Sequence, residues 1–597
     1  MHGEFCEFER DFQTLEQRVS SEGVSFLTKT LPALGKAFDL ALTGMPLCVA
    51  NFKKVGRTQL PAFLRVLFRK VFDAAGKLLD SPCVISINDI RQITYLWYKL
   101  ELPYDVKIQQ KVLDRFFDTD QSLRSSSGLL SGLSDLDKAV LATGRSLVSS
   151  VFSGSVVVDD HFRPKHGPGA VATGEKPWEK MNFQRYYQRL ADVFPYEEHF
   201  FLSPTHLVDH LHDFLQWTEL ETAWSKVVLV PKDSRGPRLI AMEPLELQWI
   251  QQGVKAKMYR WIENHRLTAG HVNFEDQTIN QRLALLGSIE GEFATLDMKD
   301  ASDSVSLGLV ETLFGNIPGS DLLPALLASR SCHTELPDGR TLKLKKFAPM
   351  GSAVCFPVEA IVFWALTCAL LHRACGMPLT LAVKSVYVYG DDIIVPSWCA
   401  ERVMEGFPHF DLHFNVQKSF STGRFRESCG VDAFAGEDVT PLKIRHLPPK
   451  TKTDGQSLTS WVSYSNTLWM KGFYSAAKYC ESLIADVFTG IPYGNVKLQG
   501  YPCPVYLCRA GWPTNAHLRY RINKRLQRRE MLVWTTQSVD EVHSADRWSE
   551  VLRVLTLRHE AIRAGRYSVP RKVRTRKRFV TFECGLTPTL PTARRAV

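Results

Sequence analysis

The sequence predicts an α+β fold built around a split βαβ unit, and three patterns support this. GEFATLDM, which ends at Met298, is typical of a buried strand, and residues 353–372 are typical of a buried helix. SVYVYGDDIIVPS predicts two short strands joined by a tight turn at Gly390 and Asp391. The order strand, helix, hairpin, helix, strand over roughly 290–420 is that of a split βαβ unit.

The segments around this unit are mostly helical patterns separated by loops. Residues 1–150 contain amphipathic patterns such as LPAFLRVLFRKVFDAAGKLL between Ser- and Gly-rich loops. HGPGAVATG is a Gly-rich loop, and residues 209–224 predict a helix. WSKVVLVPKDSRGPRLIAMEP predicts a strand, a basic turn and a second strand. Helical pattern resumes in LELQWIQQGVKAKMYRWIENH and again after about residue 450.

Composition places the chain among ordinary globular proteins. Its 597 residues are 45% hydrophobic and 23% charged, which excludes a mainly disordered or collagen-like chain and suggests about four domain-sized units. The N-terminus MHGEFCEFERDF carries acids where a signal peptide needs a positive flank, and Ala360–Leu371 is too short to span a bilayer. The 13 cysteines include no CxxC pair, which disfavours a zinc site. We therefore expect a soluble, intracellular protein with no membrane partner.

Two basic runs near the C-terminus are suited to a polyanion. The net charge is +10, and the runs HLRYRINKRLQRRE and RKVRTRKR concentrate the excess cations. They contain Arg519, Arg521, Lys524, Arg525, Arg528, Arg529, Arg571, Lys572, Arg574, Arg576, Lys577 and Arg578. Nucleic-acid contact is one interpretation. A solvated helix face for the first run and a disordered tail for the second are the alternatives.

Acidic side chains cluster at the predicted strand ends. Asp391 and Asp392 are adjacent at the hairpin, where two carboxylates repel each other unless a cation offsets their charge. Asp297 ends the strand in TLDMKDASDS, so a neighbouring strand would bring it beside them. Such a cluster could hold two Mg²⁺ ions about 4 Å apart and support phosphoryl chemistry. A plain hairpin turn and a surface acidic patch are the alternatives.

Together these motifs resemble the palm of a viral RNA-dependent RNA polymerase. The resemblance is closest to the replicase subunits of single-stranded RNA bacteriophages. Runs such as DQTINQRLALLGS, FAPMGS and KSFSTGRFRESCGVDAFAGEDVTPLKIRH support it, and it covers about residues 166–446. The loop beginning His166-Gly-Pro-Gly resembles a finger loop of that family, with a structural turn as the equal alternative.

The resemblance implies catalytic roles for four residues. Asp297 and Asp391 match the two metal-bridging aspartates of the family, and Asp392 matches their auxiliary neighbour. Lys418 occupies the position from which a lysine can protonate the pyrophosphate leaving group. A surface lysine is the alternative there. The implied cofactor is Mg²⁺, as two ions, with Mn²⁺ as a substitute.

The resemblance also implies a set of nucleotide-binding residues. They are Lys232, Arg235, Arg238, Asp303, Gly351 and Ser352. The three cations lie on a hairpin over 226–240 that resembles the nucleotide-entrance motif, where they would offset triphosphate charge. Asp303 matches the residue that senses the 2′-hydroxyl. Gly351 and Ser352 resemble the loop that supports the templating position. A routine surface hairpin and a simple helix N-cap are the alternatives. Larger viral families usually place an Asn on the next helix to hold Asp303, whereas this region reads CFPVEAIV with Glu359.

The architecture implied by the resemblance is a right-hand polymerase with fingers, palm and thumb. Residues 1–150 would contribute to the fingers and to partner contacts, 151–290 would form the fingers and 291–450 the palm. Residues 451–597 would form the thumb and a basic C-terminal region. The implied reaction is template-directed addition of ribonucleotides to an RNA 3′ end, which would replicate a viral genome.

Two other functions fit parts of the sequence. A reverse transcriptase shares the palm and a Tyr-x-Asp-Asp turn, but it usually blocks the 2′-hydroxyl with an aromatic ring, whereas Asp303 would accept it. A non-enzymatic RNA-binding protein would explain the basic runs but not Asp297, Asp391 and Asp392. The resemblance implies RNA template and product and ribonucleoside triphosphates as partners. It also implies host elongation factors Tu and Ts, a ribosomal RNA-binding protein, and the cytoplasm of an infected bacterium as the location.

Overall fold

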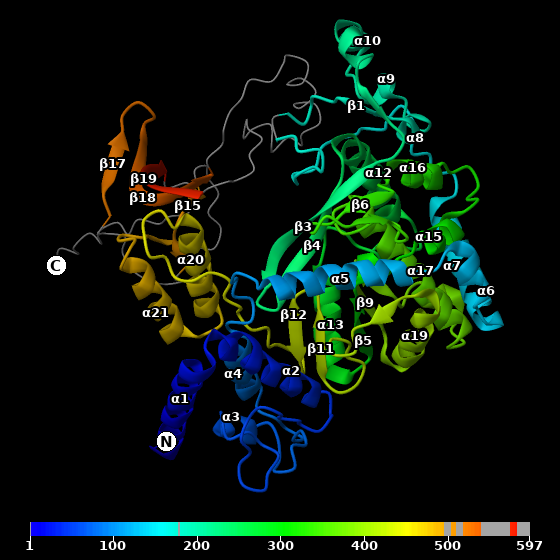
Figure 1. Ribbon diagram of the computed structural model, residues 1–597. Helices are drawn as coiled ribbons and strands as arrows, with labels where there is room; N and C mark the ends of the chain where they lie inside the picture. Colours follow the sequence, from blue (N-terminus) through cyan, green and yellow to red (C-terminus); the bar gives the residue numbers. More distant parts are fainter. Residues whose placement is uncertain (1, 177–178, 495–502, 509–517, 539–572, 582–597) are drawn as a thin grey trace, which may run out of the picture. The chain divides into compact units, whose positions relative to one another are not determined.

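The computed structural model describes residues 2–176, 179–494, 503–508, 518–538 and 573–581 (Figure 1). These residues fall into two compact units. The first consists of described residues within Met1–Thr94 and Pro103–Pro441, and the second of those within Tyr95–Leu102, Leu442–His543 and Ala564–Val597. The chain mixes helices and strands, so the α+β prediction is confirmed. The division into fingers, palm and thumb stays a prediction.

A four-stranded antiparallel sheet is the centre of the first unit. Its strands are β5 (Phe293–Lys299), β8 (Tyr387–Tyr389), β9 (Asp392–Pro396) and β10 (His413–Phe414), in the order β10-β5-β9-β8. Helices α14 (Ala301–Ser304) to α18 (Leu379–Ala382) lie between β5 and β8 in sequence, and α19 (Ala400–Gly406) lies between β9 and β10. The strand, helix and hairpin predicted over 290–420 are therefore all present, in the predicted order.

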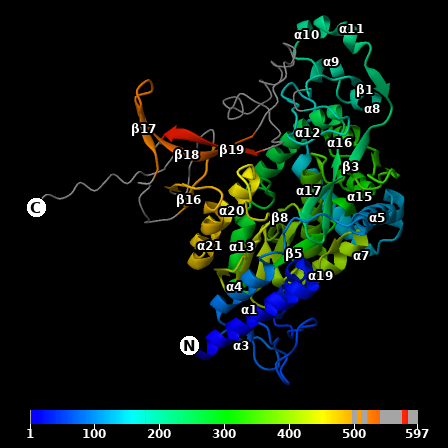
Figure 2. The ribbon, with the colours of Figure 1, turned by 60° about the vertical axis from the view of Figure 1, so that its left-hand side comes forward.

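The predicted buried helix is α17 (Cys355–Arg373), which packs against β8 and α7 (Asp135–Phe152) (Figure 2). It is long and apolar enough by composition to cross a membrane, but almost all of it is buried inside the protein. It belongs to the largest apolar core, together with α12 (Leu245–Asn264), α15 (Leu307–Phe314) and α16 (Leu322–Ser329).

A second sheet carries the basic hairpin. Strands β3 (Trp224–Asp233) and β4 (Gly236–Met242) form the predicted strand–turn–strand. They continue into β6 (His333–Glu335) and β7 (Thr341–Lys343), in the order β4-β3-β6-β7. Helix α5 (Val106–Ser122) packs on β4, with Leu113 and Phe116 in the shared apolar cluster.

The predicted helix over 209–224 is wrong. The structure has α10 (Pro204–Asp209), one turn at α11 (Leu211–Phe214) and then strand β2 (Thr218–Leu220), which pairs in parallel with β1 (Arg185–Tyr187). The ring of Trp217 packs edge-on against Phe214 and stacks on Phe201, so tertiary packing overrides the local helical pattern. Short helices α8 (Gln188–Ala191) and α9 (Tyr196–His199) complete this region.

The first ninety residues pack on a distant part of the same unit. Their helices are α1 (His2–Glu22), the π-helix η1 (Phe26–Thr30), α2 (Leu31–Ala41), α3 (Arg65–Arg69) and α4 (Val84–Tyr95). They share an apolar core with β11 (Phe425–Ser428) and β12 (Val431–Phe434). Buried Arg91 crosses this core, because its guanidinium forms ion pairs with Asp39 and Asp432 and its Nε donates to Val439 O (3.0 Å).

The remaining elements of the first unit connect these sheets. They are α6 (Ser126–Ser131), α13 (Thr278–Glu290), η2 (Ser397–Cys399), η3 (Phe407–Phe410) and β13 (Glu437–Asp438). Helix α13 packs against β5, β11 and β12.

The second unit joins two helices to a basic sheet. Helices α20 (Gly455–Met470) and α21 (Tyr474–Ala485) are followed by short strands β14 (Tyr493–Gly494), β15 (Cys503–Pro504) and β16 (Leu507–Cys508). Strands β17 (Tyr520–Asn523), β18 (Arg528–Ser538) and β19 (Val573–Thr581) then form one antiparallel sheet with β15.

The prediction of helix after residue 450 therefore holds only to Ala485. Neither alternative for the basic runs is correct in the described part, since the first run forms β17, a turn and the start of β18, and the second lies in β19 from Val573 onward. Met531 and Val533 alternate into a small apolar cluster with Val580, which is strand periodicity. Three side chains of the hairpin, Arg521, Asn523 and Arg528, also bond to buried Glu530.

Candidate active site

Three aspartates lie at neighbouring backbone positions where β5 and β9 run side by side. Asp297 and Asp392 are direct partners in the antiparallel register, and Asp391 forms the turn before β9. The backbone of Asp391 reaches β5, because Met298 N donates to its carbonyl (3.3 Å). Gly390 makes this tight turn feasible, since it has φ +60° and a Cβ there would lie 2.2 Å from Phe356 Cε2.

Asp297 is held from several sides. Its Oδ2 accepts from Asn415 Nδ2 (3.0 Å), and its backbone N–H donates to Ser419 Oγ (3.2 Å). Lys418 Nζ lies 3.8 Å from Asp297 Oδ1 and 3.7 Å from Glu427 Oε1. Burial raises the pKa of Asp297 to about 6, the Lys418 ammonium opposes this, and Asp391 adds to it. The structure therefore brings Lys418 to the carboxylates, and it is not an isolated surface lysine.

The pKa of Asp392 is raised further than that of Asp297. Its Oδ2 accepts from Cys429 N (3.1 Å). Burial, followed by the charges of Asp391 and Asp297, raises the pKa of Asp392 to about 7. Crowded carboxylates of this kind favour protons or cations as partners.

These carboxylates suit Mg²⁺ only if water and substrate phosphates supply the rest of its ligands. Within the described ranges, no three His, Cys, Asp or Glu side chains form a group that could hold a metal by themselves. Mg²⁺ commonly uses one or two carboxylates and completes its shell with water and substrate phosphates. Asp297 and Asp391 can supply such a pair.

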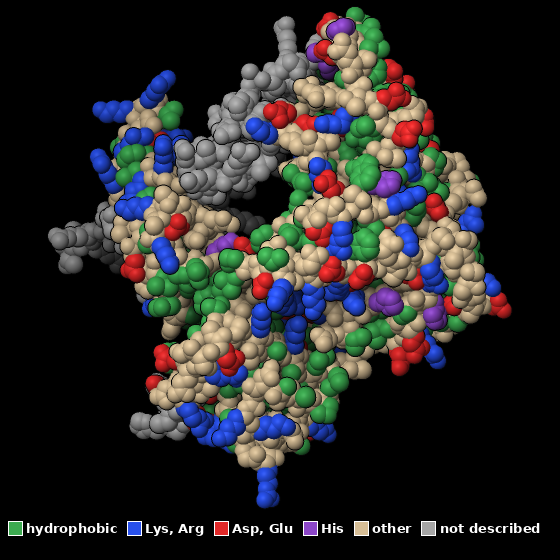
Figure 3. Space-filling view, in the orientation of Figure 1, with side chains coloured by type: hydrophobic (Ala, Val, Ile, Leu, Met, Phe, Trp, Pro, Cys, Tyr) green, Lys and Arg blue, Asp and Glu red, His purple; other side chains and the backbone are tan. Residues whose placement is uncertain are grey.

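The three cations of the basic hairpin differ in their surroundings. The Arg235 guanidinium is bound to Asp233 (2.7 Å), while Lys232 and Arg238 are exposed. Although Lys232 is exposed by surface area, desolvation by the protein atoms packed around it lowers its pKa, and the charge of nearby Arg238 lowers it further. Lys36 of α2 belongs to the same positive region, because its pKa is lowered by burial and then by Arg235 and Lys418. Sequence reasoning missed Lys36, which lies about 200 positions before the hairpin. Figure 3 shows Lys and Arg side chains gathered along α5 and the neighbouring hairpin.

Gly351 and Ser352 lie against β4. Gly351 has φ +125°, and a Cβ there would lie 2.0 Å from Ala241 O, so the loop needs glycine. Ala241 N in turn donates to Met350 O (2.8 Å). The N-cap of α17 is Val354, so the helix-cap alternative for this pair is wrong. Buried Ser352 Oγ has no hydrogen-bond partner among the described residues.

Asp303 is held by a lysine that sequence reasoning missed. Lys346 Nζ bonds to Asp303 Oδ1 (2.9 Å). Glu359 does not take this place, because it is buried beside Cys355, whose Sγ lies 3.8 Å from Glu359 Oε2. Burial, with a further contribution from Asp391, raises the pKa of Glu359 well above its usual value.

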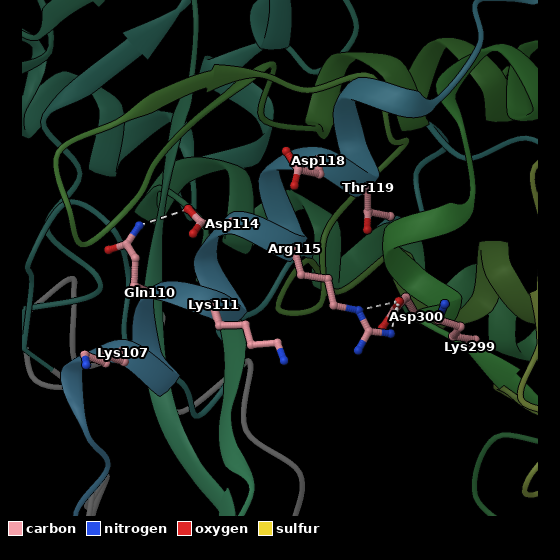
Figure 4. Close-up of a pocket in the computed structure, with 9 residues that line it drawn as sticks. All are labelled: Lys107, Gln110, Lys111, Asp114, Arg115, Asp118, Thr119, Lys299 and Asp300. Carbon is pink, nitrogen blue, oxygen red and sulfur yellow. Dashed lines mark hydrogen bonds and ion pairs between the residues drawn. The ribbon is translucent and has the colours of Figure 1, made fainter.

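Asp300 borders a hollow of about 600 Å³ between α5 and the end of β5 (Figure 4). Lys107, Lys111 and Arg115 face it at four-residue spacing, and the Arg115 guanidinium bonds to Asp300 Oδ2 (Nε 3.0 Å). Asp300 therefore has a structural partner on α5. The spacing of these cations was the sequence signal that could have linked α5 to the site.

His166 lies within the apolar core and not on an open face. Its ring packs on Trp249 (centroids 4.6 Å apart), and burial lowers its pKa well below the usual value. Lys180 Nζ donates to Gly167 O (2.9 Å) and so secures the loop from behind. These contacts favour the structural turn.

Of the C-terminal basic residues, Arg571 and Lys572 lie outside the described residues.

Comparison with known proteins gives a consistent result. A family model described as RNA replicase, beta-chain, matches residues 138–450. The RNA-directed RNA polymerase subunit beta of Qbeta virus (strain MX1) is 40% identical over 227 residues, which cover 37% of this chain and 36% of that protein. The corresponding protein of Enterobacteria phage SP is 32% identical over 358 residues, 58% of each chain. The beta chain of Escherichia phage MS2 is 37% identical over 220 residues, 37% of each.

These alignments span only about a third to three fifths of the relatives' length. Among solved structures, one described as the in situ structure of BmCPV RNA-dependent RNA polymerase at elongation state has a TM-score of 0.33 and 10% sequence identity. It covers 56% of this chain and 32% of that chain.

Proposed function

Because this chain belongs to the RNA replicase beta-chain family, we propose that it is an RNA-directed RNA polymerase, the catalytic subunit of a phage RNA replicase. It would add ribonucleotides to the 3′ end of a growing RNA on an RNA template and so replicate the viral genome. The names of the relatives support this activity. The observation that carries the proposal is the pairing of Asp297 with Asp392 beside the Asp391 turn.

The architecture we propose is a right hand. The sheet β10-β5-β9-β8 would be the palm, within residues 291–450, and its order with helices between β5 and β8 and between β9 and β10 supports a split βαβ unit. Residues 151–290 would form the fingers, with residues 1–150 contributing to them, and 451–597 would form the thumb and basic C-terminal region.

Asp297 and Asp391 would hold two Mg²⁺ ions, or Mn²⁺ in their place, with Asp392 as their neighbour. Mg²⁺ bound there would activate the 3′-hydroxyl and offset charge on the leaving pyrophosphate. Asn415 and Ser419 fix the orientation of Asp297 for this task. The pKa of about 6 for Asp297 means that the carboxylate is ionised, and ready for a cation, above that pH.

The cations around the carboxylates would act on the triphosphate. Lys232, Arg235 and Arg238 would offset its charge as it enters, and Lys418 would donate a proton to the leaving pyrophosphate. The position of Lys418 beside Asp297 supports this role. Gly351 and Ser352 would support the templating position, and Asp303 would accept a hydrogen bond from the 2′-hydroxyl.

The partners we propose are RNA template and product, ribonucleoside triphosphates, elongation factors Tu and Ts and a ribosomal RNA-binding protein of the host. The protein would bind them in the cytoplasm of the infected bacterium. The words "subunit beta" in the names of two relatives support an assembly with further subunits.

The deciding experiment is template-directed incorporation of labelled nucleotides with Mg²⁺, comparing NTPs with dNTPs. It is run with the purified chain and again with bacterial extract, and it includes Asp391→Asn and the exposed control Asp486→Asn. We expect NTP-specific product that Asp391→Asn abolishes and Asp486→Asn leaves intact, with RNA binding nearly unchanged. A need for extract would indicate host subunits. Preference for dNTPs would indicate a reverse transcriptase, and RNA binding without any product an RNA-binding protein.

A further inference from the structure

Lys346 is a fully buried cation beside the proposed sugar-recognition residue. Its side chain is 0% exposed, and its ammonium bonds to Asp303 Oδ1 at 2.9 Å. The same Nζ lies 3.9 Å from Asp120 Oδ1 and 3.5 Å from the centre of the Phe116 ring. Burying an ammonium is costly unless it is paired, so a lysine at this place needs all three contacts.

The other partners of Lys346 are themselves fixed. Both carboxylate oxygens of buried Asp120 accept backbone N–H groups, from Lys345 (3.1 Å) and Lys346 (3.0 Å). Asp120 and Phe116 belong to the buried face of α5. These bonds hold Asp120 to the Lys345–Lys346 backbone, whereas Asp303 is bonded to the lysine side chain. The direct hydrogen bond of the ammonium therefore goes to Asp303.

The backbone ties this lysine to the turn that carries Asp303. Leu307 N donates to Lys345 O and Phe347 N donates to Val305 O, both at 2.8 Å. Arg330 Nη2 donates to Lys346 O (3.0 Å) from the other side. Backbone hydrogen bonds just after α14 and the side-chain bond to Asp303 consequently tie Lys346 to this helix at several points.

This arrangement leaves Asp303 one oxygen for a ligand. Oδ1 is taken by Lys346, and the structure records no hydrogen bond to Oδ2 from any described residue. The side chain of Asp303 is 25% exposed, so a ligand can reach it. An ionised carboxylate offers only acceptors, which suits a hydroxyl donor and gives nothing to a deoxyribose.

We propose that Lys346 is a positioning residue for ribose selectivity, which fixes Asp303 so that its second oxygen accepts the 2′-hydroxyl of the incoming nucleotide. This inference rests on the proposed polymerase function. Lys346 bonds to Asp303 from the loop before α17, whereas the resemblance implies an amide on the following helix as the partner of Asp303. It acts through Asp303 and does not touch the nucleotide.

The test compares Lys346→Met with Lys345→Met. Lys345 is the exposed neighbour, and its Nζ donates to Gln121 O (2.7 Å). The measured quantity is kcat/KM for NTPs divided by kcat/KM for dNTPs in the full chain. We expect Lys346→Met to lower this ratio about tenfold, the size of one hydrogen bond to a charged group. Lys345→Met should keep the wild-type ratio.

A double-mutant cycle separates positioning from general damage. On an Asp303→Asn background, Lys346→Met should change the ratio less than about twofold, because the two residues act as one unit. A selectivity ratio that stays at the wild-type value in folded Lys346→Met, or equal losses on both backgrounds, would overturn the inference.

A second measurement serves if Lys346→Met does not fold. Asp303→Asn removes the charge partner from the buried ammonium and should lower the thermal midpoint of the full chain. Asp300→Asn, which loses an exposed pair with Arg115, should not. Equal midpoints for both variants would contradict the Lys346–Asp303 pairing. This result needs no polymerase activity, and absence of activity in the wild-type chain would count against the proposed function alone.

Discussion

At the scale of single residues, the molecule places charges where stability alone would not. Asp297 and Asp392 are cross-strand partners, and like charges opposite each other destabilise a sheet. The buried ammonium of Lys346 and the buried carboxyl of Glu243 are further examples. All of them lie on or next to the strands that build the candidate site, which is where function is expected to cost stability.

Glu243, which follows β4, should make stability depend on pH. It is 1% exposed, accepts a hydrogen bond from Ser331 Oγ, and burial raises its pKa to about 7. Because the folded pKa is raised above the unfolded value of 4.5, its contribution is fully present below pH 4.5 and is lost as pH rises through about 7.

We therefore expect Glu243→Gln to gain stability relative to the wild type between pH 5 and pH 8.5. The measurement is the thermal midpoint of both chains across this range, with exposed Glu290→Gln as the control. Neighbouring Glu246, whose burial also raises its pKa to about 7, titrates in both chains and cancels in the difference. Parallel curves for wild type and Glu243→Gln would refute the assignment.

At the scale of elements, close backbone contacts set the geometry of the site. The loop before α17 touches β4 at Gly351, and the turn between β8 and β9 touches Phe356 at Gly390. The β3–β4 hairpin, the loop before α17 and the β8–β9 hairpin are therefore linked through glycine contacts without space for a side chain.

Gly351→Ala should abolish most incorporation, because its methyl group would lie 2.0 Å from Ala241 O and must displace β4 or the loop. Gly339→Ala is the matched control. It also has a positive φ (+85°), but no atom lies within 4 Å of its Cβ, so it isolates backbone strain, about 1 kcal/mol. The measurements are primer extension and the thermal midpoint. Wild-type extension by Gly351→Ala would show that this contact is dispensable.

Local chemistry explains which parts of the site could be predicted. Strand periodicity and turn residues place Asp297, Asp391 and Asp392 within short segments, and the register confirms that β5 and β9 are neighbours. Lys346 could not be found this way, because it lies 43 positions from Asp303 and 226 from Asp120. A buried lysine has no periodic signature, and only the tertiary fold shows that it is paired.

At the scale of the whole molecule, many Lys and Arg side chains lie on β17, β18 and β19. The sequence pattern does not identify these segments as strands. For the basic runs, the sequence leaves a helix face and a disordered tail as the alternatives to nucleic-acid contact, because alternating Arg and Lys mask strand periodicity. Pairing across a long gap decides the structure, as in the bond from Thr535 Oγ1 to Arg576 O. The helix predicted over 209–224 is wrong for a similar reason, since β2 pairs with β1, a strand that lies about 30 positions earlier in the chain.

Neutralising β19 should weaken RNA binding and reduce its salt dependence. We expect Arg576→Gln, Lys577→Gln and Arg578→Gln together to lower the slope of log affinity against log salt by about 0.7 per lost phosphate contact. The control removes three exposed cations of the first unit, Lys77, Lys138 and Arg402. An unchanged slope for the β19 variant would exclude RNA contact at this strand.

The Arg91 cross-link has a consequence for protein synthesis. Arg91 and its partner Asp432 are 341 positions apart, and Phe425 and Phe434 complete the apolar core of the first ninety residues. At about 5–20 residues per second, translation separates the two halves of this core by roughly 17–70 s. The nascent N-terminal helices must wait that long with an open apolar face, so this part of the chain completes its core only after residues 425–434 have been made, although it is made first.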